Sequence, residues 1–196
     1  MEILGKVLGN TGRVKIMKLF LLNKSKGFSK KEVTKRSRVS PAIVARELRI
    51  LASVNFIKKR SATSLEWFFN SAFKYASEFE ELLVRSDTLN KQTILDNFKK
   101  IGNVKLLIIS GVFIKNNDSR VDLLVVGDRL KRAKIESGVR KLEAEIGTEL
   151  VYAIFDTKEF TYRLNMYDKL ARDILDYPHE VLLQGKELST QLLKKA

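Results

Sequence analysis

Apolar residues in the first part of the chain recur at helical spacing. Between Arg13 and Leu22 they return every three or four positions and form a broad stripe, which predicts a helix with one buried face. The stripe consists of Val14, Ile16, Met17, Leu19, Phe20 and Leu21.

Two further helices are predicted from their first residues. Ser29 and Glu32 have the spacing of a capping box, in which each residue bonds the main chain of the other, so a short helix should begin there and end near Arg36. Ser40 followed by Pro41 is typical of an N-cap and a first helical position. The helix that they open should bury Val44, Leu48 and Leu51 and turn Ala42, Arg46, Arg49 and Ser53 outward.

The pattern then changes to aromatic and β-branched runs. Residues 56–60 and 65–69 are two such runs separated by Ser61-Ala62-Thr63-Ser64, which predicts a β-hairpin. Trp67, Phe68 and Phe69 should pack on the helices or lie in an interface rather than stack on bases.

The remaining chain alternates between helical and strand-like patterns. Helices are expected over 71–85, 88–101, 130–146, 157–164 and 169–175, and strands over 104–109, 120–126 and 149–155, with a last short apolar run at 180–183. The apolar face of 71–85 could pair with a second copy or pack within the same chain, and the pattern favours neither. An α/β layer follows for the C-terminal part, so the fold class is a two-domain α+β protein.

Composition adds the distribution of charge. The chain has 196 residues and a net charge of +14, and residues 1–70 carry 16 Lys/Arg against four acids, or +12. Such asymmetry indicates a polyanion-binding module joined to a nearly neutral one, although a basic surface kept for solubility remains an alternative. The bases are interleaved with helix signals, which disfavours an anionic membrane as partner.

Several classes of protein are excluded by residue type. Without cysteine there is no disulfide or thiolate zinc site. His179 is the single histidine, which removes Ser-His-Asp chemistry unless that residue carries it alone. The apolar run from Leu106 to Ile114 is much shorter than a membrane span, and residues 1–6 lack the pattern of a signal peptide. The expected location is the cytoplasm.

The segments 27–33 (Gly-Phe-Ser-Lys-Lys-Glu-Val), 40–48 (Ser-Pro-Ala-Ile-Val-Ala-Arg-Glu-Leu) and 56–60 (Phe-Ile-Lys-Lys-Arg) carry a family resemblance. Over residues 11–70 the chain resembles winged helix-turn-helix transcriptional regulators of the arsenic-repressor-like group. The resemblance implies three helices with a β-hairpin wing that bind duplex DNA. We therefore expect a DNA-binding domain at 1–70, a connector helix at 71–87 and a second domain at 88–196.

The candidate DNA-binding residues follow from this resemblance and from the shape of B-DNA, whose major groove admits an α-helix. Arg46 and Arg49 should contact base edges or nearby phosphates, with Ser40 and Ala42 near the start of the same helix. A further six basic residues would contact phosphates and set the position of the protein along the duplex: Lys30, Lys31, Arg38, Lys58, Lys59 and Arg60.

The C-terminal part shows a second resemblance. A helix, a strand ending in Ser110-Gly111, and a strand carrying Asp122 are similar to the minimal nucleotidyltransferase domain of the polymerase-beta-like superfamily, over residues 90–185. Nucleotidyl transfer needs Mg²⁺ held by paired carboxylates, but the position two before Asp122 is Arg120, whose charge repels a cation. We therefore expect no catalytic residues, no metal site and no cofactor.

The degenerate domain could still bind a ligand. One hypothesis is that Ser110, Gly111 and Arg120, beside Asp122, hold a phosphate-bearing ligand such as a nucleotide; the other is that the domain serves packing and homodimerisation. The expected function is a sequence-specific DNA-binding transcriptional regulator. One alternative is an active nucleotidyltransferase that uses Asp122 and recruits its substrate through the basic domain. Another is a structural or partner-binding protein, for which RNA is one candidate partner.

Overall fold

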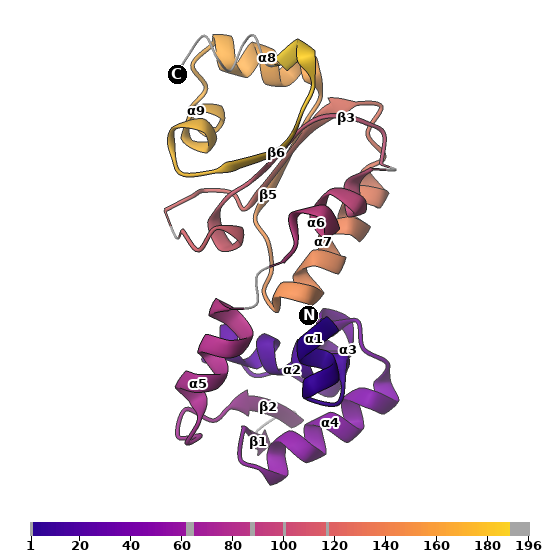
Figure 1. Ribbon diagram of the computed structural model, residues 1–196, viewed down its shortest axis with the longest axis vertical. Helices are drawn as coiled ribbons and strands as arrows, with labels where there is room; N and C mark the ends of the chain where they lie inside the picture. Colours follow the sequence, from indigo (N-terminus) through magenta and orange to yellow (C-terminus); the bar gives the residue numbers. More distant parts are fainter. Residues whose placement is uncertain (1, 62–64, 87–88, 100, 117, 189–196) are drawn as a thin grey trace. The chain divides into compact units, whose positions relative to one another are not determined.

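The protein is described here by a computed structural model that covers residues 2–61, 65–86, 89–99, 101–116 and 118–188. It is a mixed α and β protein, as the sequence predicted (Figure 1). Its contacts divide the chain into two compact units: residues 1–89 together with 140–149, and residues 90–139 together with 150–196. The sequence did not predict that residues 140–149 belong to the first unit.

The first unit consists of helices followed by a hairpin. Its elements are α1 (Glu2–Val7), α2 (Thr11–Leu22), α3 (Lys30–Ser37), α4 (Pro41–Ser53), β1 (Ile57–Ser61), β2 (Leu65–Phe69), α5 (Ala76–Glu80) and the π-helical turn η1 (Glu81–Arg85). The three helices and the hairpin expected between residues 13 and 69 are confirmed. Helix α1 was not predicted, and α5 begins five residues later than the expected start at Ser71.

Helix starts in this unit follow the predicted capping. The Glu32 amide donates to the Ser29 hydroxyl while the Glu32 carboxylate accepts from the Ser29 amide at 2.8 Å, so the capping box is present. These bonds from Ser29 lower the pKa of Glu32. Pro41 occupies the first turn of α4, but the Ser40 side chain makes no capping bond. Between α3 and α4, Arg38 adopts a left-handed conformation with φ of 53°, which turns the chain tightly from one helix to the next.

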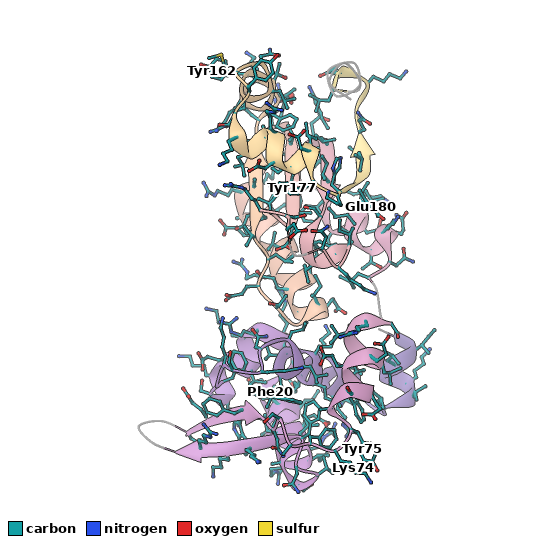
Figure 2. All side chains as sticks on the ribbon, turned by 90° about the vertical axis from the view of Figure 1, so that its left-hand side faces the viewer. Phe20, Lys74, Tyr75, Tyr162, Tyr177 and Glu180 are labelled. Atoms are coloured by element: carbon teal, nitrogen blue, oxygen red, sulfur yellow. The ribbon has the colours of Figure 1, made fainter. Side chains whose placement is uncertain are left out.

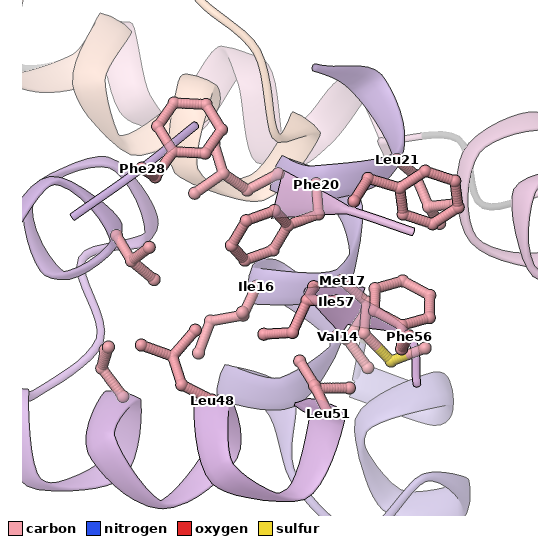
Figure 3. Packing of buried hydrophobic residues seen from close by; sticks show 14 of the residues in the cluster. Val14, Ile16, Met17, Phe20, Leu21, Phe28, Leu48, Leu51, Phe56 and Ile57 are labelled. Atoms are coloured by element: carbon pink, nitrogen blue, oxygen red, sulfur yellow. The ribbon is translucent and has the colours of Figure 1, made fainter. Parts of the chain in front are cut away.

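The core of the first unit lies between α2, α4 and the hairpin. Val14, Ile16 and Phe20 of α2 face Leu48 and Leu51 of α4, as Figure 3 shows. The predicted buried and exposed faces of α4 are confirmed. Its buried residues include Val44, Leu48 and Leu51, and its exposed residues include Ala42, Arg46, Arg49 and Ser53.

The connector packs onto this same core. The rings of Phe73 and Phe56 meet edge to face at 5.2 Å, Phe79 lies 6.3 Å from Phe56, and Leu83 is fully buried. Of the two options left open by the sequence, the apolar face of residues 71–85 thus packs largely within its own chain, although Leu82 remains 43% exposed.

The second unit is built on one mixed sheet. Its elements are α6 (Lys91–Phe98), β3 (Asn103–Ile109), the 3₁₀ turn η2 (Gly111–Phe113), β4 (Leu123–Asp128), the first part of α7 (Arg132–Ile146), β5 (Tyr152–Phe155), α8 (Thr157–Asn165), α9 (Lys169–Asp176) and β6 (Glu180–Gln184). The strand order is β5-β4-β3-β6, in which β4 and β5 are parallel and the other neighbours antiparallel. Among the described residues, no helix is long and apolar enough to cross a membrane.

One face of this sheet is covered by α8 and α9. Leu106 and Ile108 of β3 and Leu124 and Val126 of β4 are fully buried against Phe160 and Ile174. Asp156 caps α8, as predicted, by accepting from the Glu159 amide at 2.7 Å. Strand β4 begins at Leu123 rather than at the expected Arg120, because the chain bends over residues 119–122, where Asp122 bonds to Val151 through both its main chain and its side chain.

Candidate functional site

The first unit presents its basic residues at the surface. All ten side chains singled out from the sequence are exposed, namely Lys30, Lys31, Arg38, Ser40, Ala42, Arg46, Arg49, Lys58, Lys59 and Arg60. They come from four places: the first turn of α3, the turn that follows it, the outer face of α4, and strand β1.

Most of these bases have no acidic partner. Within the part of the chain that the structure describes, the ion pairs include none with Lys30, Lys31, Arg38, Arg49, Lys58, Lys59 or Arg60. Unpaired exposed cations keep their full charge for an incoming anion. Arg46 is the exception, because its guanidinium donates to Glu47.

On the hairpin, cations lie over aromatic rings. Lys59 is directly opposite Trp67, with Nζ 6.0 Å from the centre of the ring, and the Arg60 guanidinium lies 5.0 Å from the centre of Phe68. Since successive residues of a strand point to opposite faces, the hairpin carries one such pair on each face. The expectation that Trp67, Phe68 and Phe69 pack inside the protein is confirmed for Phe69, which is buried; Trp67 and Phe68 are half-buried.

Main-chain bonds fix the hairpin to the segment before α3. The amide of Phe28 donates to the carbonyl of Trp67 and the amide of Trp67 donates to that of Phe28, both at 2.9 Å. Beside this bridge, a Cβ added to Gly27 would lie 2.4 Å from the Phe68 ring and 2.6 Å from the Glu66 carboxylate. A side chain at position 27 would therefore require the Phe68 and Glu66 side chains to move.

A buried carboxylate behind the outer face of α4 was not found from the sequence. Glu47 is fully buried, and one of its oxygens accepts from Arg13 Nε at 2.7 Å. The other accepts from Arg46 Nη2 at 2.9 Å and from Asn10 Nδ2 at 3.4 Å. No local pattern marks Glu47, because Asn10 and Arg13 come from the start of α2, far away in the chain.

The four residues proposed to hold a phosphate are engaged within the second unit. The buried Ser110 hydroxyl donates to the Val121 carbonyl, and the Arg120 guanidinium forms an ion pair with Asp173 of α9. The Asp122 carboxylate accepts from the amide of Val112 at 2.8 Å and from the amide of Val151 at 2.9 Å. A Cβ on Gly111, whose φ is +55°, would lie 2.1 Å from the same carboxylate. Asp122 thus fastens the η2 turn to the start of β5.

Another part of the second unit holds a network of opposite charges. Lys105 Nζ lies 2.8 Å from Asp128 and also pairs with Glu187, while Asp128 accepts from the Thr157 amide at 3.3 Å. The hydrogen bond from Lys105 is the main cause that lowers the pKa of Asp128 from 3.8 to about 2, and the same bond raises the pKa of Lys105. These contacts join the first part of β3 and the end of β4 to the start of α8.

Among the described residues, no group of three or more His, Asp and Glu side chains is arranged to hold a metal ion. Comparison of this chain with protein-family models, with curated proteins and with solved structures finds no match.

Proposed function

We propose that this protein is a sequence-specific DNA-binding transcriptional regulator that grips duplex DNA with its first unit. The observation that carries the proposal is a set of exposed bases on α4 and β1, chiefly Arg49, Lys58, Lys59 and Arg60, for which the described residues show no ion pair. Phosphates attract such cations, and the release of counterions from DNA supplies much of the binding free energy.

The order of elements in the first unit supports the same function. Helices α2, α3 and α4 followed by the hairpin β1–β2 are the order of a winged helix, in which α4 would enter the major groove and the hairpin would contact the backbone. Helix α4 has 13 residues, an apolar inner face and an outer face that carries Arg46 and Arg49. Arginines in that position can bond guanine with two nitrogens.

In this proposal the second unit is a noncatalytic domain. Both oxygens of Asp122 accept main-chain amides, and Arg120 is ion-paired with Asp173. These bonds favour a structural role for Asp122 over metal binding, so the nucleotidyltransferase alternative gains no support from the geometry. A role in homodimerisation or in binding a nucleotide stays a prediction.

The test is selection of bound fragments from random duplex DNA by the full chain, followed by binding of the enriched duplex measured by fluorescence anisotropy over a range of KCl concentrations. We expect enrichment of a defined sequence, with affinity that falls steeply as salt rises. The double variant Arg46→Ala/Arg49→Ala should lose the sequence preference and most of the affinity.

A matched control is the double variant Lys158→Ala/Lys169→Ala, which removes the same charge from exposed positions of the second unit. It should bind like the wild type. Stronger binding of the corresponding duplex RNA, or no enrichment over the starting pool, would contradict the proposal. If the wild type transfers label from an α-labelled nucleotide and Asp122→Ala does not, the protein is instead an active nucleotidyltransferase.

A further inference from the structure

The two outward arginines of α4 differ in how the protein holds them. Arg46 donates through Nε at 3.2 Å and Nη2 at 2.9 Å to one oxygen of Glu47. Arg49 donates through Nε to the Ala45 carbonyl of its own helix, at 3.3 Å, and has no acidic partner within the described residues.

The pairing of Arg46 with Glu47 constrains where its side chain lies. Neighbouring residues of a helix point in directions about 100° apart and do not normally face each other. Glu47 points into the protein and is fully buried, so Arg46 reaches it only by curving along the flank of α4. Arg46 is therefore drawn away from the middle of the outer face.

Glu47 itself is fixed from behind. Its second oxygen accepts from Arg13, and Arg13 also donates to the Leu8 carbonyl at 3.0 Å. The amide group of Asn10 touches Glu47 while its oxygen caps α2 through the Gly12 amide at 2.7 Å. The carboxylate is thus held from two sides, and Arg46 cannot pull it outward.

These contacts leave the two guanidinium groups with different chemistry. Glu47 accepts from the Nε and Nη2 edge of the Arg46 guanidinium and offsets part of its charge. The guanidinium groups of Arg13 and Arg46 around the one Glu47 carboxylate still leave a net charge of +1. A phosphate needs that charge but no particular hydrogen-bond pattern. A guanine needs a freely placed pair of donors in the groove, which Arg49 offers.

We propose that Arg46, held by Glu47, contacts the DNA backbone and fixes the orientation of α4, and that Arg49 reads a base. The inference rests on the proposed function and divides it between two residues that the sequence could not distinguish.

Single variants of the full chain test this division, because lysine keeps a charge but loses the planar pair of donors. The variants are Arg46→Ala, Arg46→Lys, Arg49→Ala and Arg49→Lys, each checked for folding by circular dichroism. Each is measured on the enriched duplex and on a scrambled duplex of the same composition, over a series of KCl concentrations, and each is put through the same selection.

At position 46 we expect a positive charge to be sufficient for normal affinity and sequence preference. Arg46→Ala should weaken binding to both duplexes by the same factor and reduce the slope of log K against log salt by about one unit. Arg46→Lys should restore the slope and leave the selected sequence unchanged, and since it can still pair with Glu47 it keeps the test valid if the alanine variant folds poorly.

At position 49 we expect that a positive charge alone does not maintain discrimination between base pairs. Both Arg49→Ala and Arg49→Lys should lose discrimination at one base pair, by about 5- to 150-fold. A changed base preference in either Arg46 variant, or an unchanged preference in Arg49→Lys, would overturn the division while leaving DNA binding intact. A wild type without salt-dependent binding to DNA would overturn the proposed function and the division together.

Discussion

The two units of this protein use their acidic residues differently. In the first 70 residues, Glu32 caps α3 and Glu47 is buried under α4, where it pairs with Arg46 but not with Arg49. In the second unit, acids lie beside bases at the surface. These surface pairs include Arg163 with Glu159 and Asp168, Lys99 with Asp96, Lys105 with Asp128, and Arg172 with Asp176.

This difference gives the charge asymmetry of the sequence a physical consequence. Among the bases of residues 1–70, Lys18 is buried and Lys15, Lys24 and Arg36 pair with acids from later in the chain, but those on the outer face of α4 and on β1 are exposed. Many bases of the second unit instead pair with neighbouring acids. A polyanion should therefore meet an attractive field over the first unit and a much weaker one over the second.

The largest effect should come from the buried acid of the first unit. Glu47→Ala removes the carboxylate that Arg13, Arg46 and Asn10 share, and each lost hydrogen bond to a charged group costs about 1.5–3 kcal/mol. Urea unfolding followed through the fluorescence of Trp67, the single tryptophan, reports on this unit. Glu78→Ala, at an exposed position, is the control and should shift the urea midpoint little. An equal loss of unfolding free energy in both variants would show that the buried contacts of Glu47 do not stabilise the protein.

The next effect concerns the acid that binds main-chain amides in the second unit. Asp122→Ala removes the acceptor of two amides, one partly buried and one exposed, and each lost hydrogen bond should cost about 1 kcal/mol. Thermal unfolding monitored by circular dichroism should show lower stability, while DNA binding at low temperature stays unchanged. The exposed Asp118→Ala, a loop acid of the same charge, should leave the melting temperature nearly unaltered. Loss of DNA binding in the folded Asp122 variant would break the division of roles between the units.

A smaller effect is expected from one base of the hairpin. Lys58→Ala should weaken binding evenly across DNA sequences and reduce the salt slope by about one unit, because one phosphate contact is lost. Lys169→Ala, which removes an exposed base from the second unit, should leave the slope unaltered. Equal slopes for Lys58→Ala and the wild type would place the hairpin outside the interface.

The smallest effect is a dependence of stability on pH in the second unit. The pKa of Asp128 is lowered to about 2 when folded, against 3.8 ordinarily, so its contribution is full above pH 4 and disappears as pH falls toward 2. The difference in urea midpoint between wild type and Asp128→Asn should shrink over the same range. A difference that is constant between pH 5 and pH 2.5 would mean that the Lys105 contact does not stabilise the folded state.

The sequence predicted those elements whose signals are local. The capping box at Ser29, Pro41 in the first turn of α4, and the alternation around residues 56–69 each depend on a few neighbouring residues, and each element is found. Helix α1 was missed although Ile3, Leu4, Val7 and Leu8 have helical spacing, because its six residues make less than two turns. The strand expected from Arg120 begins later, because the bend before β4 depends on Asp122 and the distant Val151.

The candidate site could be predicted only as a set of exposed bases. Outward positions on α4 follow from helical periodicity, so the exposure of Arg46 and Arg49 was foreseeable. Their different environments were not, because Asn10 and Arg13 reach Glu47 only after α2 packs against α4. For the same reason, sequence spacing could not show that the Ser110 hydroxyl and the Asp122 carboxylate bond inside the second unit.

The bridge between Phe28 and Trp67 bears on how this protein can vary over evolution. Its two bonds join backbone atoms alone and so need no particular side chain, although the Phe28 ring is itself buried in the core against Phe20. Only proline, which lacks the amide hydrogen, would release the hairpin at this point. The exposed side chains Lys58, Lys59 and Arg60 can therefore vary without loss of these two bonds, whereas Ile57 and Phe69 of the same hairpin are buried in the core.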